Sequence, residues 1–275
     1  PPGTIIPTIL ITQGVLPPFL SYKMIKKKIY SFIVFLFYWV SYSQFGTIGY
    51  DFKDPYISFK GLEFAVRLST DNNIYCPNPK EIIVNKISKD EVVLSSKSLS
   101  AAGGQIISEG FIELKIKKGD ESRISISARA SHPTELGKTI LVLIKGIDVE
   151  SMDSEQSQVK GVQVFNKNKG IRVSYPSRAA TMPLVFFTSP EKEWYVLSKD
   201  REIRRKGFGC FYDHLSHEPI VLLSHDADMR KIDTSIQAPD WVLGYGRKRI
   251  DVVKERCDDL ERYFGSTPYF NKPKQ

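Results

Sequence analysis

Residues 110–130 read GFIELKIKKGDESRISISARA, and the fold class follows from this stretch. Apolar residues alternate with charged or polar ones at 110–117 and again at 123–130, which is the period-two pattern of a half-buried β-strand. The polar residues 118–121 (KGDE) join the two runs and include a glycine. Two alternating runs joined in this way predict a β-hairpin.

Further runs of this kind lie on both sides of the hairpin. We expect strands at 59–68, 81–84, 91–94, 139–144, 161–165, 171–175, 184–188, 194–197, 207–212 and 219–223. The run at 139–144 is continuously apolar, so it should be covered on both faces. The polar residues 151–158 predict a loop, and residues 166–170 (NKNKG) predict a hairpin turn between the strands on either side. Many short strands at roughly ten-residue spacing favour a sandwich over a βαβ fold.

One helix is expected, over residues 249–264 (RIDVVKERCDDLERYF). Its apolar residues recur at steps of three and four and therefore form one stripe. The stripe consists of Ile250, Val253, Cys257, Leu260 and Phe264. Gly265 suits the C-cap of this helix, and Pro268 prevents its continuation.

These patterns together predict a fold dominated by β-structure. We expect an antiparallel β-sandwich over residues 44–248, in which a sub-boundary near 151–160 stays open. Residues 249–275 should add a C-terminal amphipathic helix and a linker that leads towards a further domain of the same chain.

Residues 24–43 have the composition of a secretory signal peptide. Met24 is followed by lysines at 26–28, an apolar run at 29–40 and serines at 41 and 43, which is the order of features that directs export. The apolar run is shorter than the roughly 20 residues of a spanning helix. We therefore expect a secreted, periplasmic or cell-surface protein with no stable membrane span after signal cleavage. An uncleaved N-terminal anchor or a buried strand is the alternative.

Residues 1–23 precede Met24 and begin with Pro1. We expect them to be translated upstream sequence that is not part of the fold. A second apolar span is the alternative, although Pro7, Pro17 and Pro18 would interrupt a helix there.

The net charge of +8 is concentrated near the N-terminus. Residues 1–43 hold four lysines and no acid, so the remaining chain has 35 basic and 31 acidic residues. Nucleic-acid binding needs a concentrated basic face. This mild excess of basic over acidic residues does not indicate one, so we do not expect nucleic-acid binding. The sequence also has no dinucleotide fingerprint and no phosphate-binding loop, and we expect no cofactor.

Three cysteines are present, Cys76, Cys210 and Cys257. An odd number leaves at least one unpaired in an exported chain. A single disulfide between Cys76 and Cys210 and three free thiols both stay open.

Acids and histidines are densest between residues 200 and 240. Glycoside hydrolysis needs two carboxyl groups across one bond, and the candidates are Asp213, Glu218, Asp226 and Asp228. The candidates for metal binding are His214, His217 and His225, although no spacing typical of a metal site is present and no metal is expected. The alternative for the metal candidates is a group of solvated loop residues that cap strands, and the alternative for the carboxyl groups is a set of ordinary surface acids.

Aromatic and basic residues also gather in this part of the chain. Aromatic rings stack on sugars and arginine forks bind carboxylates or sulfates, so the pattern favours an acidic polysaccharide as partner. The candidates for glycan binding are Trp194, Tyr212, Trp241, Arg204 and Arg205. The alternative is a β core built from Trp and Phe with a solvated arginine turn. No Ser-His-Asp order and no GxSxG motif indicates a serine hydrolase.

The lysine-rich signal segment that ends in Ser-Gln, the stretch WYVLS at 194–198 and the ending LERYFGSTPY at 260–269 are similar to N-terminal modules of secreted bacterial carbohydrate-active enzymes. This resemblance to glycoside hydrolases implies a β-sandwich that leads through a helical linker into a catalytic barrel. It implies a polysaccharide or oligosaccharide as partner and a further C-terminal domain beyond Gln275. No catalytic residue can be carried over to this chain.

Three functions follow as hypotheses. The first is a non-catalytic module of an exported polysaccharide-degrading enzyme, and an apolar patch around the C-terminal helix would favour it. The second is a self-contained hydrolase that uses acids or histidines of 213–228, and a pocket gathering Asp213, His217, His225 and Asp226 would favour it. The third is a non-enzymatic surface or adhesion protein with neither feature.

Overall fold

The computed structural model describes residues 55–120, 122–154, 163–165, 170–178, 180–213, 216–227 and 234–265. All of them belong to one compact unit, residues 51–275. The expected signal peptide and the residues before it lie outside the described part, and so does the linker after residue 265. Within the described part, no helix is long and apolar enough to cross a membrane.

The described residues form seventeen strands in two sheets, and every pairing between them is antiparallel. Sheet A runs in the order β1 (Ile57–Phe59), β2 (Leu62–Thr70), β8 (Gly137–Lys145), β15 (Glu218–Asp226), β14 (Lys206–Asp213), β11 (Ile171–Tyr175). Sheet B runs in the order β4 (Ile83–Ser88), β5 (Glu91–Ala101), β6 (Ile106–Lys118), β7 (Arg123–Ser131), β17 (Trp241–Tyr245), β13 (Glu193–Ser198), β12 (Leu184–Thr188), β9 (Ser151–Ser154), β10 (Gln163–Val164).

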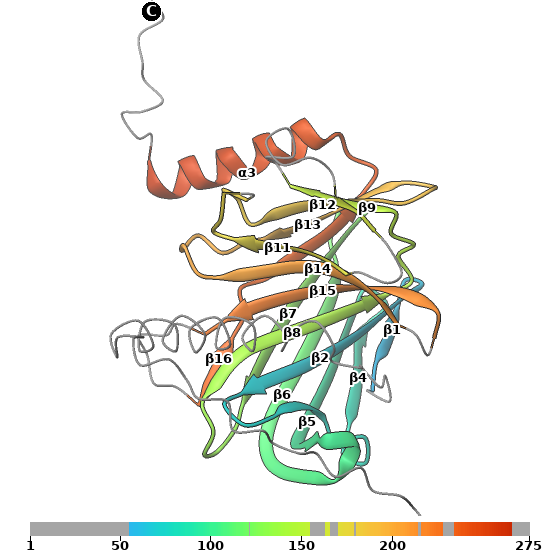
Figure 1. Cartoon of the computed structure of the whole chain (residues 1–275), viewed down its shortest axis with the longest axis vertical. Helices are drawn as coiled ribbons and strands as arrows, with labels where there is room; N and C mark the ends of the chain where they lie inside the picture. Colours follow the sequence, from blue (N-terminus) through green and yellow to red (C-terminus); the bar gives the residue numbers. More distant parts are fainter. Residues whose placement is uncertain are drawn as a thin grey trace, which may run out of the picture. The chain divides into compact units, whose positions relative to one another are not determined.

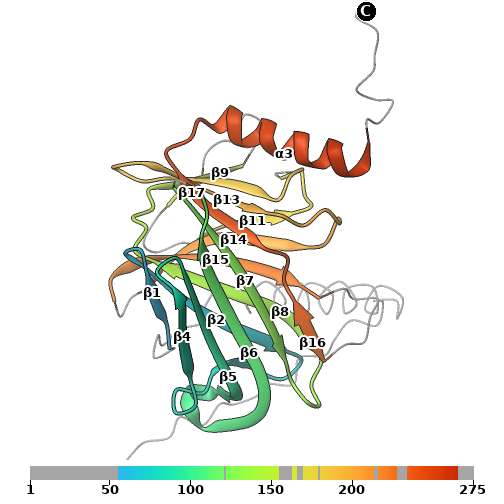
Figure 2. The same cartoon turned by 180° about the vertical axis from the view of Figure 1, so that it is seen from behind.

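Three short elements complete the two sheets. Strand β16 (Ser235–Gln237) lies beside β7, and the 3₁₀ turn η1 (Ala102–Gly104) connects β5 to β6. Strand β3 (Ile74–Pro77) pairs with β2 of sheet A and with β5 of sheet B, so it joins the sheets along one edge. Figures 1 and 2 show the two sheets from opposite sides, with β2, β8 and β15 on one side and β5, β6 and β7 on the other.

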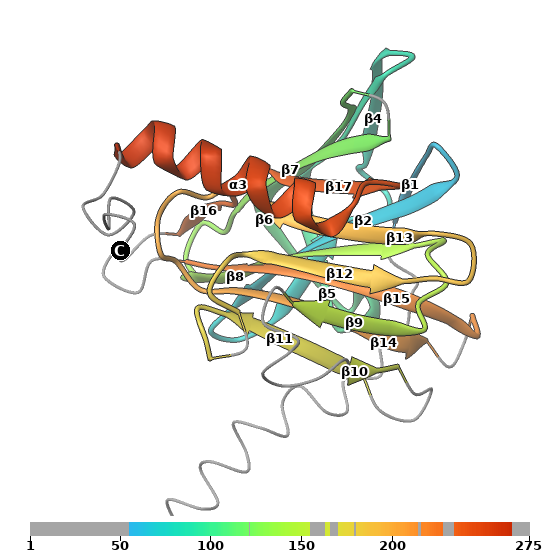
Figure 3. The same ribbon diagram turned by 90° about the horizontal axis from the view of Figure 1, so that it is seen from above.

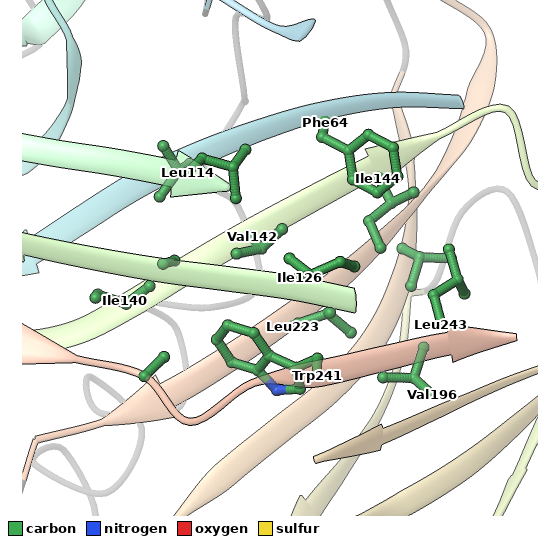
Figure 4. Packing of buried hydrophobic residues seen from close by; sticks show 14 of the residues in the cluster. Phe64, Leu114, Ile126, Ile140, Val142, Ile144, Val196, Leu223, Trp241 and Leu243 are labelled. Carbon is green, nitrogen blue, oxygen red and sulfur yellow. The ribbon is translucent and has the colours of Figure 1, made fainter. Parts of the chain in front are cut away.

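The core lies between the two sheets, where apolar side chains from both meet. Val142 and Leu223 come from sheet A, and Ile126 and Trp241 come from sheet B. All four are completely buried, and Figure 4 shows them packed together. Burying a side chain of this size contributes roughly 1.5–3 kcal/mol, so the core accounts for much of the stability.

The outer faces of both sheets carry smaller apolar clusters. Leu143 of β8 packs with Ala65 and Ile220 on the outer face of sheet A. Since Val142 beside it faces the inner core, the expectation that 139–144 is covered on both faces is confirmed.

The helix α3 (Arg249–Phe264) has the bounds that the sequence predicts. Its Val252 packs against Phe186, Tyr195 and Val242 on the outer face of sheet B. Figure 3 shows α3 lying along β12, β13 and β17. The prediction of an all-β antiparallel fold with a C-terminal helix is therefore confirmed.

Most predicted strands are present, and the hairpin from which the fold class followed is β6–β7, with Leu114 opposite Ala128. The strand expected at 59–68 is confirmed from Leu62 onwards as β2, but its start at Phe59 is wrong, because Lys60 and Gly61 have φ angles of 54° and 79° and turn the chain between β1 and β2. The loop expected at 151–158 is wrong for Ser151–Ser154, which form β9.

The hairpin expected around 166–170 is also wrong. Strand β10 pairs with β9 in sheet B, whereas β11 pairs with β14 in sheet A, so the chain passes from one sheet to the other there. A polar turn between two short strands is compatible with either connection, and only the pairing partners decide which one forms.

Candidate functional site

Strand β15 separates the acids and histidines that the sequence places close together. Asp213, His217 and Glu218 lie at the hairpin that joins β14 to β15, whereas His225 and Asp226 lie at the far end of β15. At about 3.3 Å per residue, the strand spans roughly 26 Å from Glu218 to Asp226. The structure therefore does not form the pocket that would gather Asp213, His217, His225 and Asp226.

Two of the predicted site residues, His214 and Asp228, lie outside the described part of the chain. Among the residues that are described, no three His, Cys, Asp or Glu side chains are grouped as they would be around a metal ion. The three cysteines are free thiols, and Cys210 is buried on β14.

Asp213 is held by its own hairpin. Its carboxylate accepts a hydrogen bond of 2.6 Å from the Ser216 hydroxyl and one of 3.3 Å from the Ser216 backbone N–H. Lys145 of β8, the strand on the other side of β15, lies 3.6 Å away. This buried carboxylate stabilises the turn between β14 and β15, while its cross-strand neighbour Glu218 is exposed.

A second carboxylate, Asp200, is the centre of a buried ionic cluster. Arg204 donates to both of its oxygens at 2.9 Å, and Lys206 lies 2.6 Å from one of them. Burial by itself would raise the pKa of Asp200, but the hydrogen bonds from Arg204 and Lys206 lower it to about 2. Asp200 therefore stays ionised at neutral pH although its side chain is almost completely buried.

His225 belongs to the same cluster because of the strand register. Lys206 of β14 lies opposite His225 of β15 on one side and Tyr175 of β11 on the other. Burial first, and then the charges of Lys206 and Arg204, lower the pKa of His225 to about 3. Its Nδ1 has no hydrogen-bond partner among the described residues. His225 is thus a neutral, buried side chain with no route to solvent that would suit a catalytic base.

The cluster also connects the chain after β13 to α3. Arg256 of α3 is buried and donates to the backbone carbonyl of Asp200. It donates a further bond of 2.7 Å to Asp259, which in turn accepts one of 2.9 Å from Arg201. We call Asp200, Arg204, Lys206, His225 and Arg256 the buried cluster, and the bond from Arg256 to Asp200 attaches the middle of α3 to the segment that follows β13.

The residues predicted to bind glycans do not share one surface. Trp241 is fully buried in the core and Trp194 is 5% exposed, so neither ring is available for stacking on a sugar. The physical reason is that both rings face the inner side of sheet B, and the alternative of a core built from Trp and Phe describes them correctly. Tyr212 is half-buried at the far end of β14 from the buried cluster.

The two predicted arginines differ from each other. Arg204 is bound to Asp200 by two hydrogen bonds inside the buried cluster. Arg205 is 68% exposed and forms only a 3.4 Å ion pair with Asp226 among the described residues. In the expected arginine turn, the Arg204 side chain is therefore held by the fold, whereas the Arg205 side chain lies in solvent.

A pocket of about 180 Å³ lies on the outer face of sheet B, beneath the first half of α3. Its floor is apolar, and its walls carry Arg123, Lys199, Arg247 and Glu255 from four separate parts of the chain. Sequence reasoning did not find this site, because Arg123 and Glu255 are 132 residues apart and no local spacing connects them. We call it the α3 pocket.

The exposed side of α3 carries uncovered apolar side chains. Ile250 and Phe264 are 56% and 60% exposed, and Cys257 lies midway between them at steps of seven residues, or about two helical turns. The helix turns Val252 and Arg256 towards the sheet, so the predicted apolar stripe is only partly covered. We call Ile250, Cys257 and Phe264 the α3 seam.

Comparisons with known proteins give little direct guidance. No protein-family model and no curated protein matches the sequence. The structure is similar to a galactose mutarotase related enzyme from Lactobacillus acidophilus, with a TM-score of 0.40 and 8% identity over 67% of this chain and 83% of that one. It is also similar to a protein of Synechocystis sp. PCC 6803, with a TM-score of 0.35 and 7% identity over 68% and 78%. At these scores the likenesses carry no argument about function.

Proposed function

We propose that the chain is a non-catalytic β-sandwich module of an exported polysaccharide-degrading enzyme, and that the α3 seam packs against a further domain of the same polypeptide. The observation that supports this is the row of Ile250, Cys257 and Phe264, in which Ile250 and Phe264 are exposed and Cys257 between them is half-buried. A row of large apolar side chains on one helix face is typical of a surface that is buried in a larger assembly.

A domain of the same polypeptide is the occupant that the geometry favours. Phe264 is the last helical residue, so a segment that continues from residue 265 begins beside the seam. Tethering of this kind raises the effective concentration of a docking surface to the millimolar range for short linkers. Tyr263 packs edge-on against Phe264 with 4.9 Å between ring centroids, and this widens the apolar surface at that end.

The competing hydrolase function has weaker support. It needs acids and histidines assembled at one place, and β15 holds Glu218 and Asp226 at opposite ends. Of the two candidate histidines that the structure describes, His225 is buried within the buried cluster and His217 is exposed. The resemblance to carbohydrate-active enzymes suggests polysaccharide as the substrate class, and this part of the proposal depends on that resemblance.

The three cysteines allow a direct test. Cys257 lies on the seam, Cys76 is half-buried on β3 at another edge, and Cys210 is buried in the core. We would measure alkylation rates of each thiol by mass spectrometry in residues 44–275 and in the longer protein, with a domain after residue 275, that the proposal requires. The proposal expects Cys257 to react at least about tenfold more slowly in the longer protein, while Cys76 is unchanged.

The same two proteins separate the rival functions. Only the longer protein should release reducing ends from polysaccharides. Release by residues 44–275 alone would overturn the proposal in favour of the self-contained hydrolase. If Cys257 reacts equally fast in both proteins and neither hydrolyses polysaccharide, the remaining hypothesis is a non-enzymatic surface or adhesion protein.

A further inference from the structure

The α3 pocket is lined by Tyr195, whose position depends on a glycine in the neighbouring strand. Tyr195 of β13 lies opposite Gly244 of β17, and a Cβ at position 244 would come within 2.4 Å of the Tyr195 ring and hydroxyl. The ring therefore lies directly over Gly244, on the face of sheet B that α3 covers. Only a residue without a side chain at 244 permits this position of the tyrosine.

The Tyr195 hydroxyl is buried in the wall of the pocket. It lies near Arg247, whose pKa is raised by Glu255 in the first place and by Tyr195 to a smaller degree. Beside a guanidinium, this hydroxyl can turn its oxygen towards the arginine and donate its hydrogen to an acceptor on a ligand.

Two arginines converge on one carboxylate beside this hydroxyl. Arg123 donates to the two oxygens of Glu255 at 2.9 and 2.6 Å, and Arg247 donates to one of the same oxygens. Burial would raise the pKa of Glu255, but the hydrogen bonds from the two arginines lower it. A guanidinium has five N–H donors, so these contacts leave donors on both arginines for another acceptor.

The side chains around the pocket carry a net positive charge. Arg123, Lys199 and Arg247 face Asp120 and Glu255, which leaves one positive charge uncompensated. Lys199 is exposed at the edge of the pocket and forms no ion pair with any described residue. An anionic group on a ligand is therefore expected near Lys199 and Arg247.

The size and the lining limit the class of ligand. A volume of about 180 Å³ is below the roughly 300 Å³ at which sites for drug-sized ligands begin, so the ligand must be small. The floor contains Leu197 and Val242 of sheet B, Val252 of α3 faces them, and donors and acceptors occupy the walls. An apolar floor with polar walls suits one sugar ring, which has an apolar face and hydroxyl groups around its edge.

We propose that the α3 pocket binds a single uronic acid residue of an acidic glycan. Its carboxylate accepts hydrogen bonds from Lys199 and Arg247, and its ring hydroxyls bond to Glu255 and to the Tyr195 hydroxyl. The choice of a sugar rests on the proposed function, whereas the acidic group follows from the charges of the pocket itself.

The test is a calorimetric and NMR titration of residues 44–275, which contain the whole compact unit 51–275. The probes are D-galacturonate, D-glucuronate and neutral D-galactose. The proposal expects a uronate to bind, to shift resonances of residues around Tyr195, and to bind at least about fivefold more tightly than galactose. Added salt should weaken uronate binding and leave galactose unaffected.

Three variants and one control variant test the proposed contacts in the α3 pocket. Tyr195→Phe removes only the hydroxyl and should weaken uronate binding about fivefold. Lys199→Ala should remove the preference for uronate over galactose, while Lys254→Ala, which removes an exposed lysine from the outer side of α3, is the control of equal charge and should change nothing. Gly244→Ala displaces Tyr195 and should weaken binding in a protein whose circular dichroism remains that of a β-sandwich.

The proposal is overturned if neither uronate binds at tens of millimolar, if galactose binds equally well, or if Tyr195→Phe and Lys199→Ala bind as the unaltered chain does. These outcomes do not depend on the α3 seam, since protection of Cys257 is measured without any sugar. A protected Cys257 with no uronate binding would remove this inference and leave the proposed function standing.

Discussion

The buried cluster and the α3 pocket are built alike and are enclosed differently. In both, cationic side chains converge on one carboxylate, Asp200 in the cluster and Glu255 in the pocket. The Asp200 side chain is 3% exposed, whereas that of Glu255 is 41% exposed. An enclosed ion pair cannot exchange its partner for a ligand, so the cluster serves stability, while the open pair can take part in binding.

The largest expected difference between the two regions follows from removal of the central charge. Asp200→Asn removes the carboxylate that pairs with the fully buried Lys206 and should lower the free energy of unfolding by about 3–5 kcal/mol. Glu255→Gln acts on a partly solvated group and should cost about 1 kcal/mol or less. Urea denaturation of both variants measures this difference, and equal losses would show that the comparison is wrong.

A smaller effect concerns the pH dependence of the buried cluster. An unfolded histidine binds a proton below about pH 6.5, whereas folded His225 does so only near its pKa of about 3. Between these values the unfolded state binds more protons, so stability falls as the pH falls. From about pH 7.5 to about pH 5 the loss from His225 should be about 2 kcal/mol.

His225→Leu removes this titration, and its stability should decline less over the same pH interval. Thermal or urea unfolding at both pH values measures the difference. If the variant loses stability with pH as steeply as the unaltered chain does, His225 is not the group responsible. Asp200 contributes separately at lower pH, because the stability that its ionised form provides is lost as the pH falls from about 3.8 towards 2.

The smallest expected loss of stability is that of Arg205→Ala, which is compared with its neighbour Arg204. Arg204→Ala removes both hydrogen bonds to buried Asp200 and should cost about 1.5–3 kcal/mol. Arg205→Ala removes one exposed ion pair and should cost less than about 0.5 kcal/mol. Denaturant midpoints of the two variants provide the measurement, and a large loss from Arg205→Ala would mean that its surroundings are more enclosed than the structure indicates.

The seam and the pocket also differ in how far the sequence could predict them. The apolar stripe of α3 can be seen in the spacing of Ile250, Cys257 and Phe264, because helical periodicity is local. Which side of that stripe meets the sheet could not be seen, and Val252 and Arg256, outside the predicted stripe, are the residues that α3 buries. The pocket could not be predicted at all, since Arg123, Tyr195 and Glu255 come from three distant elements.

The candidate site shows the same limit for single residues. Trp194 and Trp241 suit a sugar-binding surface and a β core equally well by composition, and only the face of sheet B on which they lie decides between them. His225 and His217 are eight residues apart in sequence, yet β15 places one in the interior and the other in solvent.

The sequence by itself determined the class of fold, the positions of most strands, and the bounds of α3. These follow from the alternation of period two and the helical stripe, which depend on neighbours within a few residues. Only the tertiary structure decided that β10 and β11 belong to different sheets, that Asp200 gathers Arg204 and Lys206, and that an open pocket forms around Glu255. Such arrangements depend on pairings between distant strands, and the free energy of those pairings is not contained in any local pattern.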